Sequence, residues 1–290
     1  MILVTGATGQ LGLQIVQQLA VRLPGAGAGR LAVSVRDPER AGALAARGIE
    51  VRRGDFDQPE ALRATFAGAS RLVIVSTDGP KAQRIAQHRN AIEAARGAGV
   101  EHILYTSFLD ADSASPSEFA QVHADSEAAL AASGVGHTIL RNGMYADFLP
   151  MTFAGALQSG LLQLPAGEGR VSYLSRNELA GAIAAAAVAP RLEKRIYELT
   201  GQTAHDYHDL AARVGAATGK TLRYEPVGED AYAGVLEGVG MPAWLARAMA
   251  NMFTAAAAGR LARTTNDFAA LVGHPPKSID CLIAEFFRAV

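Results

Sequence analysis

Short runs of β-branched and other apolar residues alternate with stretches of helical periodicity from Ile2 to Arg141. This alternation is typical of βαβ units, in which a helix returns the chain to the start of the next parallel strand. Each run reads as apolar on both faces, as expected for a strand covered by helices on two sides. Six strands are predicted here, at residues 2–5, 31–35, 50–53, 72–75, 102–106 and 137–140.

The helices between these strands carry their own start signals. Asp37 and Gln58 each precede a proline and read as N-cap residues, because proline suits the first position of a helix. Right-handed crossovers then predict an α/β fold with a doubly wound parallel sheet of the Rossmann type. The predicted helices begin near Gln10, Pro38, Pro59, Gln83 and Phe119.

Beyond Arg141 the regular alternation stops. Residues 142–169 have no regular pattern, residues 179–188 form an alanine-rich helix after a capping box at Ser175 and Glu178, and residues 196–200 read as a strand returning to the sheet. The last third is mostly helical. We therefore expect a dinucleotide-binding domain at 1–142, with 171–200 returning to it. A smaller, mostly helical substrate-binding region is expected at 143–170 and 201–290. The glycine-rich segment 24–29 is interpreted as a flexible connector, since no Lys-Ser/Thr follows it.

Composition excludes several classes of function. With 27 Lys and Arg against 28 Asp and Glu, the net charge is −1, and no nucleic acid partner is expected. No apolar run reaches the 18 or so residues of a membrane span. The single Cys281 excludes an internal disulfide framework. Strand-like residues begin at Ile2 and leave no room for an export signal, so we expect a cytoplasmic protein. His205 and His208 lack a third ligand, so no metal site is expected.

The most informative segment follows the first predicted strand and opens the first helix. Glycines at Gly6, Gly9 and Gly12 suit a tight turn, a close approach of a pyrophosphate and close packing of helix on strand. The amides at the start of the helix then bind phosphate oxygens. The predicted dinucleotide-binding residues of this turn are Gly6, Thr8, Gly9, Gln10, Leu11 and Gly12.

Arg36, at the end of the second strand, indicates the type of dinucleotide. Dinucleotide folds place an acidic residue here for a free ribose hydroxyl and a basic residue for a 2′-phosphate, so Arg36 favours NADPH over NADH. A surface salt bridge is the alternative for Arg36. Asp55 and Phe56, after the third strand, either cradle the adenine ring or serve as a turn aspartate and a core side chain.

These residues resemble the NmrA-like branch of the atypical short-chain dehydrogenase/reductases, which includes bacterial NAD(P)H:quinone oxidoreductases and triphenylmethane reductases. The resemblance spans nearly the whole chain. It rests on segments 4–12, 35–38, 53–57, 105–107 and 140–145, together with His123 and Glu127. It implies that Ser76 and Thr77 bind NADPH together with the residues named above. It also implies that some members are homodimers. It also implies that Asn142, Gly143 and Tyr145 lie near the nicotinamide and the substrate.

A catalytic pair common in the wider superfamily is missing. Its Tyr-x-x-x-Lys motif is replaced by His123 and Glu127, four residues apart on one helix face. An ionised Glu127 is expected to hold His123 and raise its pKa, which makes His123 a candidate general acid. The alternative is an ordinary pair on the helix surface. Ser107 either binds the substrate or caps its loop.

A site without that tyrosine suits acceptors that take hydride with little help from a proton donor. The sequence therefore predicts an NADPH-dependent oxidoreductase acting on a quinone or a similar electron-poor aromatic acceptor, with NADH as a second cofactor. Proximity and orientation would carry most of the catalysis. The alternative is a non-catalytic NAD(P)-binding sensor, because a fold does not determine a function.

Overall fold

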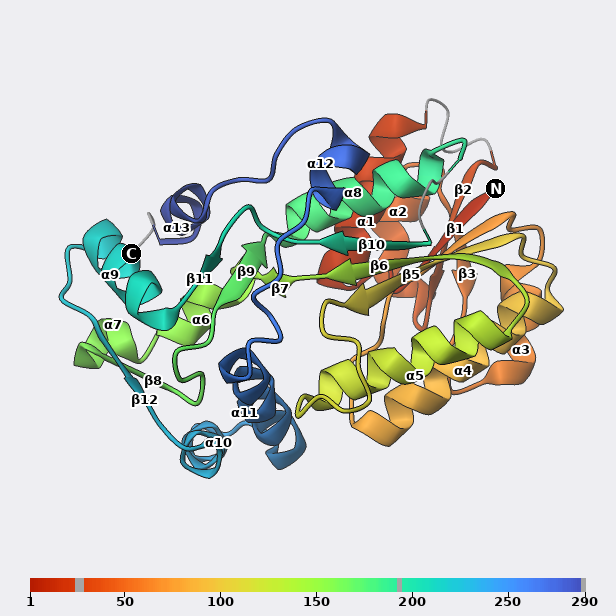
Figure 1. Ribbon diagram of the computed structural model, residues 1–290. Coiled ribbons are helices and arrows are strands. Elements are labelled where there is room, and N and C mark those ends of the chain that lie inside the picture. The colour runs from red at the N-terminus through yellow and green to blue at the C-terminus, as the bar shows by residue number, and fades with distance from the viewer. Residues whose placement is uncertain (24–28, 192–194, 288–290) are drawn as a thin grey trace.

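A seven-stranded sheet forms the centre of the molecule in the computed structural model, which describes residues 1–23, 29–191 and 195–287 (Figure 1). The connector expected at 24–29 lies outside the described residues except for its last glycine. All neighbouring strands of this sheet are parallel. The strands are β1 (Ile2–Thr5), β2 (Leu31–Val35), β3 (Glu50–Arg53), β4 (Arg71–Ile74), β5 (His102–Phe108), β6 (Gly136–Asn142) and β10 (Ile196–Leu199).

The strand order is β10-β6-β5-β4-β1-β2-β3. From β1 the chain first builds outward through β2 and β3, then crosses back to β4 and builds toward β10. The direction of winding therefore reverses between β1 and β4, which confirms the doubly wound fold. In such sheets, ligands bind outside the carboxyl ends of the strands at this reversal.

Two details of the strands differ from the sequence-based prediction. β5 and β6 are longer than expected, because they pair without interruption as far as Phe108 and Asn142. β3 is not apolar on both faces, as Glu50 and Arg53 are exposed. That prediction was wrong for β3, because β3 is the edge strand and a neighbour pairs with only one side of it.

Helices cover both faces of the sheet (Figure 1). On one face α1 packs against α8, and α12 packs against α8 and β10. On the other face α4 lies between α3 and α5. The helices of these layers are α1 (Gln10–Arg22), α2 (Gly42–Ala45), α3 (Pro59–Phe66), α4 (Lys81–Gly97), α5 (Glu118–Ala132), α8 (Arg176–Val188) and α12 (Asp267–Val272).

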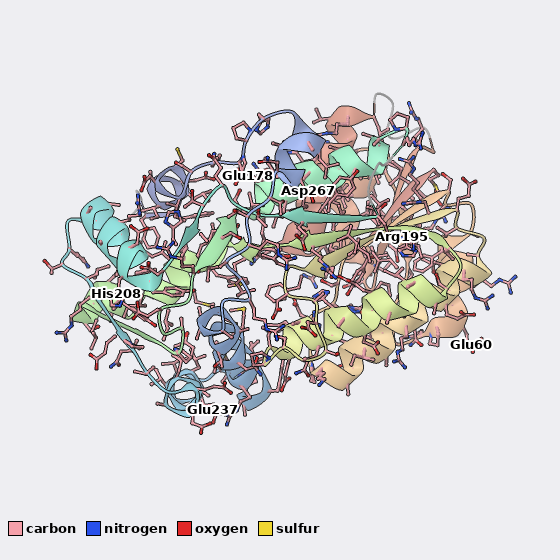
Figure 2. The ribbon with its side chains drawn as sticks, viewed as in Figure 1. Glu60, Glu178, Arg195, His208, Glu237 and Asp267 are labelled. Atoms are coloured by element: carbon pink, nitrogen blue, oxygen red, sulfur yellow. The ribbon has the colours of Figure 1, made fainter. Side chains whose placement is uncertain are left out.

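The start of α8 confirms the predicted capping box. The Ser175 hydroxyl accepts a hydrogen bond from the Glu178 amide at 3.2 Å, and the Glu178 carboxylate accepts one from the Ser175 amide at 3.1 Å. Glu178, labelled in Figure 2, also accepts from the Lys277 amide at 2.6 Å. β10 follows α8 and pairs in parallel with β6, so the predicted return of the chain to the sheet is confirmed.

A second, smaller region lies beyond the carboxyl ends of β5 and β6. Two small sheets hold it together, with strand orders β11-β9-β7 and β12-β8. Residues 142–169, which showed no regular pattern, contain short strands and helices here. The strands of this region are β7 (Met144–Tyr145), β8 (Leu161–Leu164), β9 (Val171–Leu174), β11 (Ala204–His205) and β12 (Arg223–Pro226). Its helices are α6 (Leu149–Phe153), α7 (Ala156–Ser159), α9 (Tyr207–Thr218), α10 (Glu229–Gly238), α11 (Ala243–Ala257) and α13 (Ile279–Phe287).

The smaller region has its own apolar core, built around Phe153, Tyr207 and Phe253, which are all almost fully buried. The described residues also contain two short 3₁₀-helices, η1 (Pro38–Ala41) and η2 (Ala146–Phe148). Within the described ranges, no helix is long and apolar enough to cross a membrane.

Candidate cofactor and acceptor site

The glycine-rich turn lies between β1 and α1, at the reversal of the sheet. Gly6 has φ +63°, in the left-handed region that favours glycine. Its amide donates to the Ser34 carbonyl at 3.1 Å, and its carbonyl accepts from the Gly9 amide at 2.9 Å. A Cβ on Gly12 would lie 2.2 Å from the Gly6 carbonyl oxygen, so a side chain at residue 12 would push α1 away from the turn. This close approach leaves the first amides of α1 facing the position that a pyrophosphate takes in such folds.

The exposure of the turn residues fits a bound dinucleotide. Gly6, Gly9 and Gln10 are exposed, Thr8 is half-buried, and Leu11 is buried beneath the turn. Gly9 is the N-cap residue of α1 and contributes no side-chain hydrogen bond to the cap. The amides at the start of the helix are therefore not shielded by a capping side chain, and a phosphate group can take that place.

Arg36 is exposed directly after β2, and within the described part of the chain it makes no hydrogen bond or ion pair. The surface salt bridge considered as its alternative role is therefore absent among those residues. Asp37 accepts a hydrogen bond from the Glu39 amide at 3.1 Å, as an N-cap residue does. Asp37 is thus engaged, while Arg36 is free to bind a phosphate.

Asp55 and Phe56 follow β3. The Asp55 carboxylate accepts a hydrogen bond from the Asp57 amide at 3.1 Å, which is a turn contact. The Phe56 side chain is buried in the core beneath α3 and α4. These contacts account for both residues as structural elements, and an additional role beside the adenine stays a prediction.

The loop after β4 is held by side chains at the ends of neighbouring strands. Thr5 accepts a hydrogen bond from the Val75 amide at 3.0 Å, and Thr106 accepts one from the Ser76 amide at 2.9 Å. The Thr77 amide donates to Nε2 of His88 at 3.0 Å. Ser76 and Thr77 are thereby fixed at the reversal of the sheet, where the resemblance places the cofactor.

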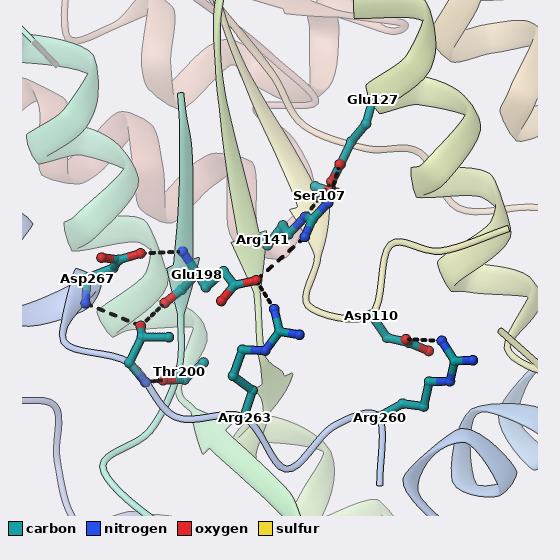
Figure 3. Close-up of polar contacts among 10 residues, drawn as sticks. Ser107, Asp110, Glu127, Arg141, Glu198, Thr200, Arg260, Arg263 and Asp267 are labelled. Carbon is teal, nitrogen blue, oxygen red and sulfur yellow. Dashed lines mark hydrogen bonds and ion pairs between the residues drawn. The ribbon is translucent and has the colours of Figure 1, made fainter. Parts of the chain in front are cut away.

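The predicted pairing of Glu127 with His123 is wrong. Glu127 instead accepts hydrogen bonds from Ser107 at 2.6 Å and from both Nε and Nη2 of Arg141, at 2.9 and 2.6 Å (Figure 3). Arg141 also reaches Glu198 at 3.5 Å. The Glu127 carboxylate is therefore engaged by the bidentate contact with the guanidinium of Arg141. The Ser107 hydroxyl donates to the same carboxylate and helps to hold it in place.

His123 lies in a separate polar cluster beneath α5, which we call the buried cluster. Its members are Arg84, His88, Tyr105, His123 and Ser126. Nδ1 of His123 lies 2.8 Å from the Tyr105 hydroxyl, and Nε2 lies 3.3 Å from Nη2 of Arg84. Burial, together with the positive charge of Arg84, holds the pKa of His123 well below its usual range. His123 is therefore neutral at pH 7, not the imidazolium that the sequence led us to expect.

The proton positions in the buried cluster follow from its donors. Arg84 can only donate, so Nε2 of His123 accepts and its Nδ1–H donates to Tyr105. The Thr77 amide likewise makes Nε2 of His88 an acceptor, so its Nδ1–H donates to Ser126 at 2.8 Å. The Ser126 hydroxyl in turn donates to the Val122 carbonyl at 2.9 Å. With both histidines neutral, each of their ring nitrogens therefore has a hydrogen-bond partner.

Asn142, Gly143 and Tyr145 lie where β6 ends and the smaller region begins. The Asn142 amide nitrogen donates to the Tyr145 hydroxyl at 3.4 Å, while its amide oxygen is buried without a partner among the described residues. Tyr145 stacks on Phe148, with ring centroids 5.8 Å apart, and the Arg176 guanidinium covers both rings. The Gly143 amide donates to the Leu199 carbonyl at 2.8 Å and ties this segment to β10.

Sequence reasoning missed Arg84, His88 and Tyr105. A signal was present, because residues 84, 88, 91 and 95 follow the i, i+4, i+7, i+11 spacing of one buried helix face. Two members of that stripe on α4 are polar. Polar residues on the core face of a helix indicate a buried network or a site.

The chain belongs to the NmrA-like family, whose sequence profile matches residues 1–263. It is 36% identical over 288 residues to quinone oxidoreductase 2 of Escherichia coli (strain K12), covering 99% of each chain. It is 29% identical over 290 residues to the NAD(P)H azoreductase of Xenophilus azovorans, covering 100% of this chain and 97% of that one.

Solved structures give the same result. The Escherichia coli NADPH-dependent quinone oxidoreductase in complex with NADPH has a TM-score of 0.93 at 36% identity, and 99% of this chain and 100% of that chain are covered. The Citrobacter sp. triphenylmethane reductase in complex with NADP(H) has a TM-score of 0.91 at 33% identity, with 99% and 100% covered. The expected family and fold are therefore confirmed.

Proposed function

We propose that this chain is an NADPH-dependent oxidoreductase that transfers hydride to a quinone or a similar electron-poor aromatic acceptor. The observation that supports the proposal is made at the reversal of the sheet. Gly9 and Gln10 at the start of α1 are exposed there, and so is Arg36, which has no ion-pair partner among the described residues. These positions suit a pyrophosphate and a 2′-phosphate. The relatives named as a quinone oxidoreductase and an azoreductase act on acceptors of this class. Their activity favours an enzyme over a sensor.

The residues of the chain bind and orient the reactants. Gly6, Gly9 and the amides from Gln10 onward hold the pyrophosphate, and Arg36 reads the 2′-phosphate. NADPH supplies the hydride when it is bound. Asn142 and Tyr145 lie at the edge where the resemblance places the nicotinamide and the acceptor. Orienting the bound cofactor and the acceptor toward each other would supply most of the rate enhancement.

The state of His123 supports electron-poor acceptors. Reduction of a ketone needs a proton delivered to a weakly basic oxygen, and a neutral His123 with Nδ1–H turned toward Tyr105 cannot deliver one to a substrate. Burial raises the pKa of Tyr105, which removes its hydroxyl as a ready acid. A quinone or a cationic dye accepts hydride without prior protonation, so this site suits them.

NADPH consumption with three acceptor classes tests the proposal. We expect turnover with 1,4-benzoquinone and with a cationic triphenylmethane dye, and much slower turnover with cyclohexanone. Comparable rates with the ketone would contradict the assignment of acceptor class. Tight NADPH binding without turnover of any acceptor would favour the sensor.

Three further expectations belong to this proposal. We expect NADH to bind more weakly than NADPH, the chain to form a homodimer, and the protein to reside in the cytoplasm. Titration calorimetry with both cofactors, light scattering, and fractionation of the source cells test them in turn.

A further inference from the structure

Arg84 is a buried cation that pairs with no carboxylate in the described part of the chain. The negative charge of Asp78, beyond ion-pair distance, acts on Arg84 and favours its charged form. It lies in the first turn of α4, directly after the loop that carries Ser76 and Thr77, and is only 5% exposed. No carboxylate lies within ion-pair distance of it in the described ranges, and its Nε has no hydrogen-bond partner. Its contacts are the Nη2 hydrogen bond to His123 and the face of the Phe119 ring, 5.5 Å from the guanidinium carbon.

Such an arrangement is costly for the folded chain. Removing a charge from water costs several kcal/mol unless another charge or a full set of hydrogen bonds replaces the water. Burial lowers the pKa of Arg84, but a guanidinium remains protonated at every physiological pH. His123 cannot compensate the charge, because it is neutral and supplies a single lone pair. The contact with His123 does fix the direction of the guanidinium.

The position of Arg84 relates it to the acceptor. Burial raises the pKa of Tyr145, from the segment placed near the nicotinamide, and the positive charge of Arg84 is one of the causes that counteract this rise. The buried cluster also joins Arg84 through Tyr105 and His88 to Thr77, from the loop placed at the cofactor. Arg84 is therefore linked through His123, Tyr105 and His88 to the loop placed at the cofactor, and its charge acts on the segment placed at the acceptor.

We propose that Arg84 stabilises the negative charge that develops on an oxygen of the acceptor during hydride transfer, with His123 as a positioning residue for its guanidinium. This inference rests on the proposed function. Hydride addition brings two electrons and one proton to a quinone, while NADPH is oxidised to NADP⁺. One acceptor oxygen then carries a negative charge until a proton from water neutralises it. A fixed, desolvated guanidinium near that oxygen lowers the barrier.

The charge of the acceptor gives a direct test. A quinone is neutral and becomes an anion on accepting hydride, so Arg84 should accelerate its reduction. A triphenylmethane dye is a cation, and hydride addition at its central carbon makes it neutral. A guanidinium gives no help to that reaction and repels the dye. Arg84 should therefore discriminate between two acceptors that use the same cofactor.

The experiment compares Arg84→Met with Arg89→Met, which removes an exposed arginine of the same helix paired with Asp125. Arg84→Met should lower kcat for 1,4-benzoquinone by about 10²- to 10³-fold, the usual effect of removing one donor to a developing oxyanion. Reduction of the cationic dye should stay the same or become faster, and Arg89→Met should change neither rate. Equal losses with both acceptors, or no loss with either, would overturn the proposal. If Arg84→Met fails to fold, Arg84→Gln is measured in its place.

A binding measurement separates this inference from the proposed function. With NADP⁺ present, 4-nitrophenolate mimics the anionic product and 4-nitroanisole is its neutral counterpart. We expect Arg84→Met to weaken binding of the phenolate alone and to leave the Kd of NADPH unchanged. If this pattern is found in a protein that reduces no acceptor, the proposed anion site is supported and the proposed oxidoreductase activity is contradicted. If the protein reduces quinones but binds 4-nitrophenolate no more tightly than 4-nitroanisole, only the proposed anion site is contradicted.

Discussion

Two arginines of the candidate site, Arg36 and Arg84, have no ion-pair partner among the described residues, and their surroundings differ. Arg36 is exposed after β2, where water solvates its charge whether or not a ligand is bound. Arg84 is buried between α4 and α5 and is only 5% exposed. An unpaired cation in water costs almost nothing, whereas an unpaired buried cation is strongly unfavourable. The missing partner is therefore much stronger evidence for a function at Arg84 than at Arg36.

The largest expected effect concerns acid stability of the buried cluster. Burial and the charge of Arg84 lower the pKa of His88 from 6.5 to about 3. Between these values the unfolded chain binds a proton that the folded chain does not, so stability falls as pH falls through this window. The slope is about 1.4 kcal/mol per pH unit for each such histidine, and His123 adds a second one.

Urea unfolding at pH 7, 6, 5 and 4 measures this dependence. His88→Gln should lower the pH dependence of the free energy of unfolding by the contribution of one histidine. His274→Gln, which changes an exposed histidine, should leave this dependence unchanged. A parent protein equally stable at pH 7 and pH 5 would show that water reaches the cluster, and the contrast between the two arginines would then disappear.

The second prediction tests the exposed arginine. If Arg36 binds the 2′-phosphate, Arg36→Ala removes a charge-assisted contact of roughly 1.5–3 kcal/mol, or about 10- to 150-fold in NADPH affinity. NADH lacks that phosphate, so its Kd should change little. Titration calorimetry of both cofactors measures the ratio, with Arg47→Ala as an exposed control. Equal weakening of NADH and NADPH would mean that Arg36 supports the fold or the adenine.

The third prediction concerns the glycine-rich turn between β1 and α1. In Gly12→Ala, the new methyl group meets the Gly6 carbonyl oxygen at 2.2 Å unless α1 moves. We expect a loss of about 1–3 kcal/mol in the free energy of unfolding, as for other overpacked sites. Gly42→Ala is the matched control, because a Cβ there has no neighbour within 4 Å. Denaturant unfolding should show a loss in the first variant alone.

The smallest effect is expected at His123. Since His123 is neutral and its Nδ1–H faces Tyr105, His123→Ala should slow quinone reduction by less than about tenfold, short of the 10²- to 10⁴-fold typical of a lost general acid. Stopped-flow measurement of hydride transfer at saturating NADPH gives this rate. A loss in the general-acid range with NADPH binding intact would contradict the minor role expected for His123.

The amino-acid sequence by itself determined the features that depend on near neighbours in the chain. The Asp37 cap, the capping box at Ser175 and the glycine turn before α1 each use contacts within a few residues, so local spacing is enough to specify them. The return of β10 to the sheet was also predictable, because its apolar run follows a helix as the earlier strands do.

Only the tertiary structure decided which partners the polar residues of the site take. A spacing of four residues on α5 allows Glu127 to meet His123, but it does not require it. Arg141 on β6 provides a bidentate partner for the carboxylate, while Arg84 on α4 and Tyr105 on β5 enclose His123. The charge state of His123 depends on burial between those elements, which are distant in the chain and become neighbours only when the sheet and its helices have assembled.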